Sequence, residues 1–347
     1  MNKQAGQIAV LDFEPANEEF CEQVIAGLSQ RPRTLPCKFF YDEIGSALFL
    51  KICELPEYYI TRTEMRILRE RGGEIASALG RGIELIGLGT GAGTKTRILL
   101  DNLEAPVAYV PVDISREQLT QSTIAFRKRF PALEILPVCA DYLQPFDLPP
   151  RGPVANRTVV YFPGSTIGNL EPDDATDFLK KIVDMVGNGR ATLRGATMAR
   201  QSLALPGNCL SPVGGGLLMG VDLKKSKTIL ERAYNDSAGV TAQFNLNLLA
   251  RDNRELGADF DLLHWHNLAI YNEKAGRIEM HLLSGLPQTV TIADRTFAFA
   301  PGEHIITEFS YKYSPPEMIA LAGAVGLHFE KIWTDEEKLF GLFLFSL

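Results

Sequence analysis

The sequence predicts an α/β fold built on a Rossmann-like parallel sheet, and three observations point to it. Short apolar runs alternate with segments of helical apolar spacing through most of the chain. A glycine-rich turn joins the run at residues 84–88 to a helix that begins near Thr94. Two strand-like segments, residues 327–334 and 339–345, end the chain as a hairpin. Strand–helix alternation of this kind gives parallel strands joined by right-handed crossovers.

Composition and charge are those of a globular protein with a small-molecule partner. The chain has 347 residues, of which 46% are hydrophobic and 22% charged, enough for one large or two medium domains. The net charge of −7 and the lack of a long basic run argue against a nucleic-acid partner. No apolar run approaches the roughly 20 residues that span a bilayer, and the polar first residues predict no signal peptide. We therefore expect a cytoplasmic protein with no membrane partner.

The cysteines and histidines do not form a metal-binding pattern. Five cysteines are scattered along the chain without a C-x-x-C pair, which is typical of reduced thiols. His264 and His266 flank Trp265, but zinc needs three or four protein ligands. We expect no metal.

The glycine-rich turn favours a nucleotide-like ligand. Gly89 and Gly91 lie between the apolar run and the helix, and a residue without Cβ lets a ligand approach the main chain. A strand–turn–helix unit places such a ligand at the helix start. Lys95 lacks the P-loop spacing, so we exclude an NTPase. From the glycines alone, a tight turn that binds nothing stays an alternative.

Polar residues follow the next two predicted strands, at the sheet edge where ligands bind. Asp113 follows the run at residues 107–112, about 20 residues past the turn, where an acid holds ribose hydroxyls. Asp141 follows the run at residues 133–138 and is suited to an adenine amino group, with Tyr142 against the ring. The alternatives are a helix N-terminal acid for Asp113 and a solvated loop acid for Asp141.

Aromatic residues dominate two stretches before the glycine turn. Tyr41 lies in an aromatic cluster, and Tyr58 and Tyr59 are adjacent after a proline. They are either half-buried anchors with wet hydroxyls or the lining of a substrate pocket. Residues 190–213 carry arginines but no acid and interrupt the α/β rhythm, so we predict a mobile insertion there.

Five stretches of the sequence are long and specific: residues 35–42, 55–64, 164–170, 233–245 and 277–280. Together they resemble one family, the SAM-dependent histidine Nα-methyltransferases of ergothioneine biosynthesis. The resemblance runs from about residue 15 to the C-terminus, apart from the insertion.

This resemblance implies a class I SAM-dependent methyltransferase domain, Rossmann-like, with a second domain that binds the substrate. The methyltransferase domain would comprise residues 63–224 and 284–347, and the substrate domain residues 1–62 and 225–283. The family converts L-histidine to the trimethyl betaine hercynine by three methyl transfers. We expect a monomer that acts on an amino acid.

The resemblance also implies roles for individual residues. SAM, the co-substrate, would be held by Gly89, Gly91, Lys95, Asp113, Asp141 and Tyr142. The amino and carboxylate groups of the substrate would be held by Asn169 and Tyr234, with Thr241 acting through water. Tyr58 and Glu279 would recognise the imidazole, and Tyr41 would lie near the reacting amine. Glu279 pairing with Arg277 or Lys274, and Asn169 as a plain turn residue, are the alternatives.

The chemistry needs positioning more than a strong base. An α-amine has a reference pKa of about 8, so the neutral amine that attacks the methyl group is accessible near neutral pH. Placing nitrogen, methyl carbon and sulfur in line can supply on the order of 7–11 kcal/mol. This agrees with the lack of an obvious Asp–His pair.

Two departures from the family pattern keep alternatives open. Gly87 stands where the family has an acid, which weakens SAM contacts or lets another group fill the space. His281 stands two residues after Glu279, where family members carry a serine. The same chemistry on another amino acid, such as a tryptophan derivative, and a non-catalytic SAM-binding protein therefore stay alternatives. A nicotinamide dehydrogenase would leave the tyrosine motifs unexplained.

Overall fold

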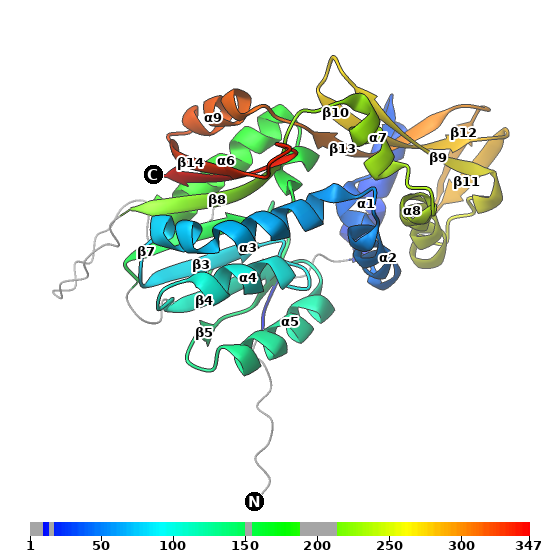
Figure 1. The fold of residues 1–347 in the computed structure, drawn as a ribbon. Helices are drawn as coiled ribbons and strands as arrows, with labels where there is room; N and C mark the ends of the chain where they lie inside the picture. The colour runs from blue at the N-terminus through cyan, green and yellow to red at the C-terminus, as the bar shows by residue number, and fades with distance from the viewer. Residues whose placement is uncertain (1–9, 14–16, 150–154, 188–213) are drawn as a thin grey trace, which may run out of the picture.

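The computed structural model describes residues 10–13, 17–149, 155–187 and 214–347. The insertion that we predicted at residues 190–213 lies outside these ranges. The described chain forms a large sheet with helices on both faces and a smaller sheet beside it (Figure 1).

The large sheet is parallel except at its C-terminal edge. Its strand order is β1-β6-β4-β3-β7-β8-β15-β14, with β5 paired to β4. Strand β15 runs antiparallel to both β8 and β14, so the predicted closing hairpin is confirmed. The strands are β1 (Leu11–Phe13), β3 (Ile83–Leu88), β4 (Ala108–Asp113), β5 (Glu134–Ile135), β6 (Val138–Ala140), β7 (Arg157–Phe162), β8 (Gly215–Asp222), β14 (His328–Thr334) and β15 (Phe340–Ser346). This topology is the class I methyltransferase form of the Rossmann-like sheet.

Helices cover the two faces of the large sheet. One face carries α3 (Tyr59–Leu79), α4 (Thr94–Asn102) and α5 (Arg116–Arg129), and the other α6 (Pro172–Gly187) and α9 (Pro315–Gly323). The central strands β3 and β4 are buried along their whole length, as expected for parallel strands covered on both sides.

The smaller sheet has the order β2-β13-β10-β9, and a two-stranded hairpin lies next to it. Helices α7 and α8 pack on one face of β9 and β10. The elements of this part are α1 (Asn17–Ser29), β2 (Arg33–Thr34), η1 (Cys37–Phe40), α2 (Glu43–Glu54), α7 (Lys227–Tyr234), α8 (Val240–Leu256), η3 (Leu262–His264), β9 (Trp265–Asn272), β10 (Arg277–Ser284), β11 (Gln288–Ile292), β12 (Arg295–Phe299) and β13 (His304–Tyr311).

The sheets divide at other positions than the predicted domain boundaries. Strand β13 pairs with β10, so the smaller sheet continues past residue 284 to Tyr311. Strand β1, from the N-terminal segment, pairs with β6 in the large sheet. The reason is the antiparallel pairing of β10 with both β9 and β13, which keeps these three strands in one sheet.

Candidate active site

The glycine-rich turn lies between β3 and α4 in a conformation that only glycine adopts easily. Gly89, Gly91 and Gly93 have φ values of 60°, 50° and 72°. A Cβ on Gly93 would lie 2.5 Å from the Phe126 ring. The amide of Gly91 donates to Asp113 Oδ2 at 2.7 Å, so the carboxylate at the end of β4 fixes the turn.

Predicted SAM residues from three strand ends gather around this turn. The other Asp113 oxygen accepts from the Ser115 amide at 2.9 Å, and burial raises the pKa of Asp113. A Cβ on Gly89 would lie 3.3 Å from the Tyr142 ring, which places this ring against the turn. Asp141 Oδ2 pairs with Lys38 Nζ at 3.2 Å. An adenine amino group would therefore share or replace the Lys38 contact.

Lys95 forms an ion pair with a buried acid, Glu64, to which we had assigned no role. Its Nζ lies 2.6 Å from Glu64 Oε2, and the Glu64 side chain has no solvent exposure. Glu64 also accepts from the Tyr161 hydroxyl at 3.0 Å and from the Gly164 amide at 2.9 Å. Glu64 thus joins α4 to β7 and to the loop that carries Asn169. The Thr-Arg-Thr-Glu stretch within residues 55–64 was the available signal.

The space beside Gly87 is filled by neighbouring side chains. A Cβ at this position would lie 2.5 Å from a Thr90 methyl carbon and 3.3 Å from the Tyr109 hydroxyl. Of the two outcomes expected for this departure, weaker SAM contacts or another group in the space, the structure shows the second.

The turn, the two strand-end acids and the Tyr142 ring fit a nucleoside ligand such as SAM. Gly89 and Gly91 carry no side chain of their own, and Asp113 already accepts a main-chain hydrogen bond from Gly91. Among the described residues, no group of three or more His, Cys, Asp or Glu side chains is placed to hold a metal ion.

Three of the predicted substrate residues form an aromatic cluster, which we call the tyrosine cluster: Tyr41, Tyr58 and Tyr234. The rings of Tyr58 and Tyr234 are 6.3 Å apart, centroid to centroid. The Phe49 ring lies between Tyr41 and Tyr58, with its centroid 5.6 Å from that of Tyr41 and 6.3 Å from that of Tyr58. Burial raises the pKa of Tyr41 and of Tyr58 far above the ordinary value, so both phenols are neutral.

Two polar residues of β13 that we had not predicted face this cluster. Glu308 and Ser310 lie opposite Met280 and Ile278 of β10, and opposite residues of paired strands share a face. The Ser310 hydroxyl lies 2.9 Å from the hydroxyl of Tyr234. The face on which Met280 and Ile278 are buried is therefore the face of the tyrosine cluster.

Glu308 has two properties expected of an acid that binds a ligand: a raised pKa and a carboxylate without a hydrogen-bond donor in the part of the chain that the structure describes. Burial raises its pKa from 4.5 to about 7, against the attraction of Lys312. Its negative charge in turn contributes to the raised pKa of Tyr41 and of Tyr58. The described residues donate no hydrogen bond to its carboxylate, which is unusual for a half-buried acid.

The structure does not bring Glu279 and His281 to the tyrosine cluster. Glu279 Oε1 accepts from Arg277 Nε at 2.8 Å and from Asn272 Nδ2 at 3.1 Å. His281 Nε2 lies 3.5 Å from the other Glu279 oxygen. These side chains occupy the opposite face of β10, because successive residues of a strand alternate. The alternative pairing of Glu279 with Arg277 is thus the one observed.

Asn169 lies at the end of the short helix η2 (Thr166–Asn169), half-buried, and its side chain has no hydrogen bond to the described residues. The helix is pressed onto β13, since a Cβ on Gly168 would lie 2.6 Å from the Tyr311 carbonyl oxygen. Just beyond, Glu171 binds the Arg277 guanidinium at 3.2 Å. The loop with Asn169 is therefore held against the smaller sheet, with the amide free for a ligand.

Thr241 lies in the first turn of α8, and its amide donates to Asp236 Oδ1 at 2.7 Å. Asp236 follows Tyr234 closely, so the end of α7 and the start of α8 are tied together. The Thr241 side chain is buried.

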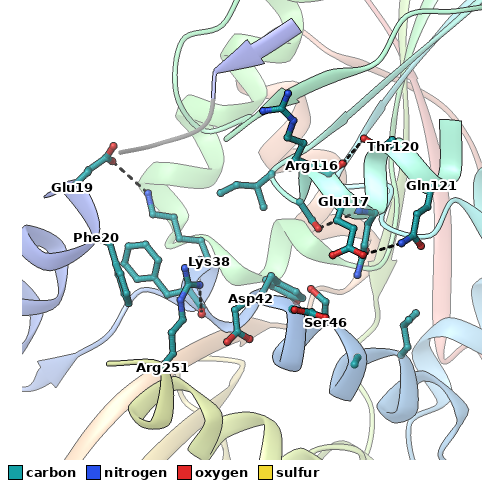
Figure 2. A pocket seen from close by; sticks show the side chains of 18 residues that line it. Glu19, Phe20, Lys38, Asp42, Ser46, Arg116, Glu117, Thr120, Gln121 and Arg251 are labelled. Carbon is teal, nitrogen blue, oxygen red and sulfur yellow. Dashed lines mark hydrogen bonds and ion pairs between the residues drawn. The ribbon is translucent and has the colours of Figure 1, made fainter. Parts of the chain in front are cut away.

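A cavity of about 830 Å³ separates η1 and α2 from the start of α5. Figure 2 shows Lys38, Asp42 and Ser46 on one side, and Glu117 and Gln121 of α5 on the other. Its lining also includes residues that border both predicted binding regions, Tyr41, Ile114 and Ser115. The cavity thus connects the neighbourhood of Asp113 with that of the tyrosine cluster.

Comparison with known proteins shows the family of this chain. Residues 20–347 match the family model described as "Histidine-specific methyltransferase, SAM-dependent". The chain belongs to this family. It is similar to the histidine N-alpha-methyltransferase of Mycolicibacterium smegmatis, with 40% identity over 96% of this chain and 97% of that protein.

Two further relatives of this methyltransferase cover most of its chain. The histidine N-alpha-methyltransferase of Mycobacterium tuberculosis is 40% identical over 92% of each chain. Ergothioneine biosynthesis protein 1 of Neurospora crassa is 29% identical over 91% of this chain and 33% of its own length. The chain is accordingly an enzyme, a SAM-dependent N-methyltransferase. None of the helices in the described ranges is both long and apolar enough to cross a membrane.

Proposed function

We propose that this methyltransferase converts L-histidine to hercynine, Nα-trimethylhistidine, by three successive methyl transfers in ergothioneine biosynthesis. One observation carries the proposal: a half-buried acid, Glu308, and a hydroxyl, Ser310, face the tyrosine cluster from one strand. The names of the relatives that share 40% of the sequence support the same substrate.

The pair Glu308 and Ser310 suits an imidazole. A neutral imidazole has one N–H donor and one acceptor nitrogen. The carboxylate accepts the N–H, and the serine hydroxyl can donate to the other nitrogen. An indole offers a single donor and no acceptor, so a tryptophan derivative would leave the hydroxyl without its partner. His281, which kept that substrate open, lies on the opposite face of β10.

The backbone groups of the amino acid would meet two other polar side chains, Asn169 and Tyr234. Asn169 can donate to a carboxylate and accept from an amine, and the Tyr234 hydroxyl supplies a second hydrogen bond. Thr241 would act through water. Tyr58 would lie against the imidazole, with Tyr41 near the amine.

Gly89, Gly91, Lys95, Asp113, Asp141 and Tyr142 would hold SAM, which supplies an electrophilic methyl group when bound. The protein has to hold the substrate amine neutral and in line. The raised pKa of Tyr41 keeps this phenol protonated, so it orients the amine without acting as a base. The amine proton leaves to water, which its reference pKa of about 8 allows.

Mass spectrometry after incubation with SAM and an equimolar mixture of the standard amino acids tests the proposal. We expect a histidine species with three added methyl groups. Methylation of another amino acid would move the substrate assignment while keeping the fold and mechanism. Absence of methylation, with SAM binding intact by calorimetry, would support a non-catalytic protein.

A further inference from the structure

Lys312 is a fully buried cation directly behind the proposed substrate site. It follows β13, two residues after Ser310, and its side chain has no solvent exposure. Its Nζ lies 2.8 Å from Asp222 Oδ2, 2.8 Å from the Ser310 hydroxyl and 3.0 Å from the Tyr234 hydroxyl. An ammonium group has three hydrogens and no acceptor, so these contacts use its whole capacity.

The ammonium restricts how the two hydroxyls can point. Because Lys312 only donates, the oxygens of Ser310 and Tyr234 both accept from it. These oxygens also lie 2.9 Å apart, so one hydroxyl donates to the other. One hydroxyl hydrogen is left over, and both oxygens already face a donor on the buried side. The leftover hydrogen is therefore directed toward the tyrosine cluster.

The position of Lys312 is itself fixed. Asp222, at the end of β8, accepts from the Tyr59 hydroxyl at 2.8 Å and from Lys225. Although burial favours its neutral form, the two lysines hold the pKa of Asp222 below its ordinary range. The Asp222 amide donates to Ser165 at 2.8 Å, which links the network to the loop of Asn169.

We propose that Lys312 is a positioning residue that makes the hydroxyls of Tyr234 and Ser310 present a hydrogen to the substrate. The site then selects a ligand with an acceptor there, either a carboxylate oxygen or the unprotonated imidazole nitrogen. A ligand with only N–H donors at the same place would leave this hydrogen without an acceptor. This inference rests on the proposed function, because it concerns how the same site recognises its amino acid.

Two substitutions separate this role from packing. In Lys312→Met the side chain has a similar length but donates to neither hydroxyl, whereas Lys312→Gln keeps an uncharged donor. Asp222 retains Lys225 and Tyr59 in both variants, so its carboxylate is not left bare. Lys225→Met is the matched control, since this lysine binds the same carboxylate but neither hydroxyl.

We expect Lys312→Met to raise the KM for histidine by about 10- to 100-fold, the loss typical of a hydrogen bond to a charged group. The KM for SAM should stay within about twofold, because the glycine turn lies elsewhere. Lys312→Gln should recover part of the loss. Lys225→Met should lower the melting temperature and leave the KM for histidine near that of the wild type.

A KM for histidine that is unchanged in Lys312→Met would overturn the assignment. Loss of folding in both variants would also overturn it, because the lysine would then be a stability element of the core. A wild-type enzyme that does not methylate histidine is a separate outcome and refutes the proposed function instead.

Discussion

Replacing Glu308 with glutamine is expected to make the ligand-free enzyme more stable and its binding of histidine weaker. The two effects have the same origin, since a half-buried carboxylate without a hydrogen-bond donor is costly until a ligand supplies one. Measuring stability and histidine binding in one variant therefore tests whether the Glu308 carboxylate lacks a hydrogen-bond donor until the imidazole binds.

The stability effect follows from the pKa of Glu308, which is raised from 4.5 to about 7 by burial. Between these values the folded protein keeps the proton and the unfolded chain has lost it, so stability falls as pH rises through this window. The full shift corresponds to about 3 kcal/mol, an upper limit because the side chain keeps some solvent contact. Above about pH 7 the variant should be more stable by up to this amount.

The binding effect has the opposite sign. A glutamine oxygen still accepts a hydrogen bond, but without the charge, and charge-assisted bonds contribute about 1.5–3 kcal/mol against about 1 kcal/mol for neutral ones. We expect the KM for histidine to rise by about 10-fold or more. In the wild type, binding should also weaken as pH falls below about 7, when Glu308 takes up its proton.

The assay combines thermal unfolding across this pH window with steady-state kinetics in histidine and in SAM. Glu279→Gln is the control, because this acid lies in the next strand on the opposite face. Its pKa is lowered, since hydrogen bonds from Arg277 and Asn272 outweigh the effect of burial, so the control should lose stability instead. If Glu279→Gln weakened histidine binding and Glu308→Gln did not, our placement of the imidazole would be refuted.

Two further substitutions test how the protein holds its ligands. Gly93→Ala should abolish SAM binding measured by calorimetry, because a Cβ would lie 2.5 Å from Phe126 in a turn with φ of 72°. Variants of the histidine site should keep SAM binding. SAM binding at the wild-type level in Gly93→Ala would contradict this account of the turn. Arg277→Met should reduce kcat/KM for histidine by about 5- to 10-fold, because Glu171 then keeps only the Tyr311 hydroxyl of its partners among the described side chains, and the Asn169 loop is held less firmly. Unchanged kinetics in low and high salt would show that the Arg277 contact does not position the loop.

Much of the fold could be predicted because local patterns matched the final structure. The buried runs before Gly89 and Asp113 form adjacent parallel strands, as apolar segments between helices require. The antiparallel end of the sheet was visible as two strand-like segments without a helix between them. The continuation of the smaller sheet past residue 284 to Tyr311 could not be predicted from such patterns, because it depends on β10 pairing with β13 across a hairpin insertion.

The substrate site was harder to predict. Strand alternation shows which residues of one strand share a face, but it does not show what that face packs against. Glu279 and Glu308 both lie in strand-like runs, and either could face a pocket. The deciding signal was present in the sequence as Glu308-Phe-Ser310, an acid with a serine two residues later, whereas Glu279 has His281 at the same spacing. Only the register of the two strands shows which acid shares a face with the tyrosine cluster.

Asp222 and Glu308, two acids near this cluster, differ in the hydrogen-bond donors and positive charges that surround their carboxylates. Asp222 has a hydroxyl donor and two ammonium groups, so its charge is compensated before any ligand arrives. Glu308 has no hydrogen-bond donor among the described residues and a pKa raised to about 7. The first acid therefore organises the site through Lys312, and the second is available to the substrate. A substrate that brings an N–H donor lowers the cost of ionising Glu308, which couples binding of the imidazole to a charge that the free enzyme holds only partly near neutral pH.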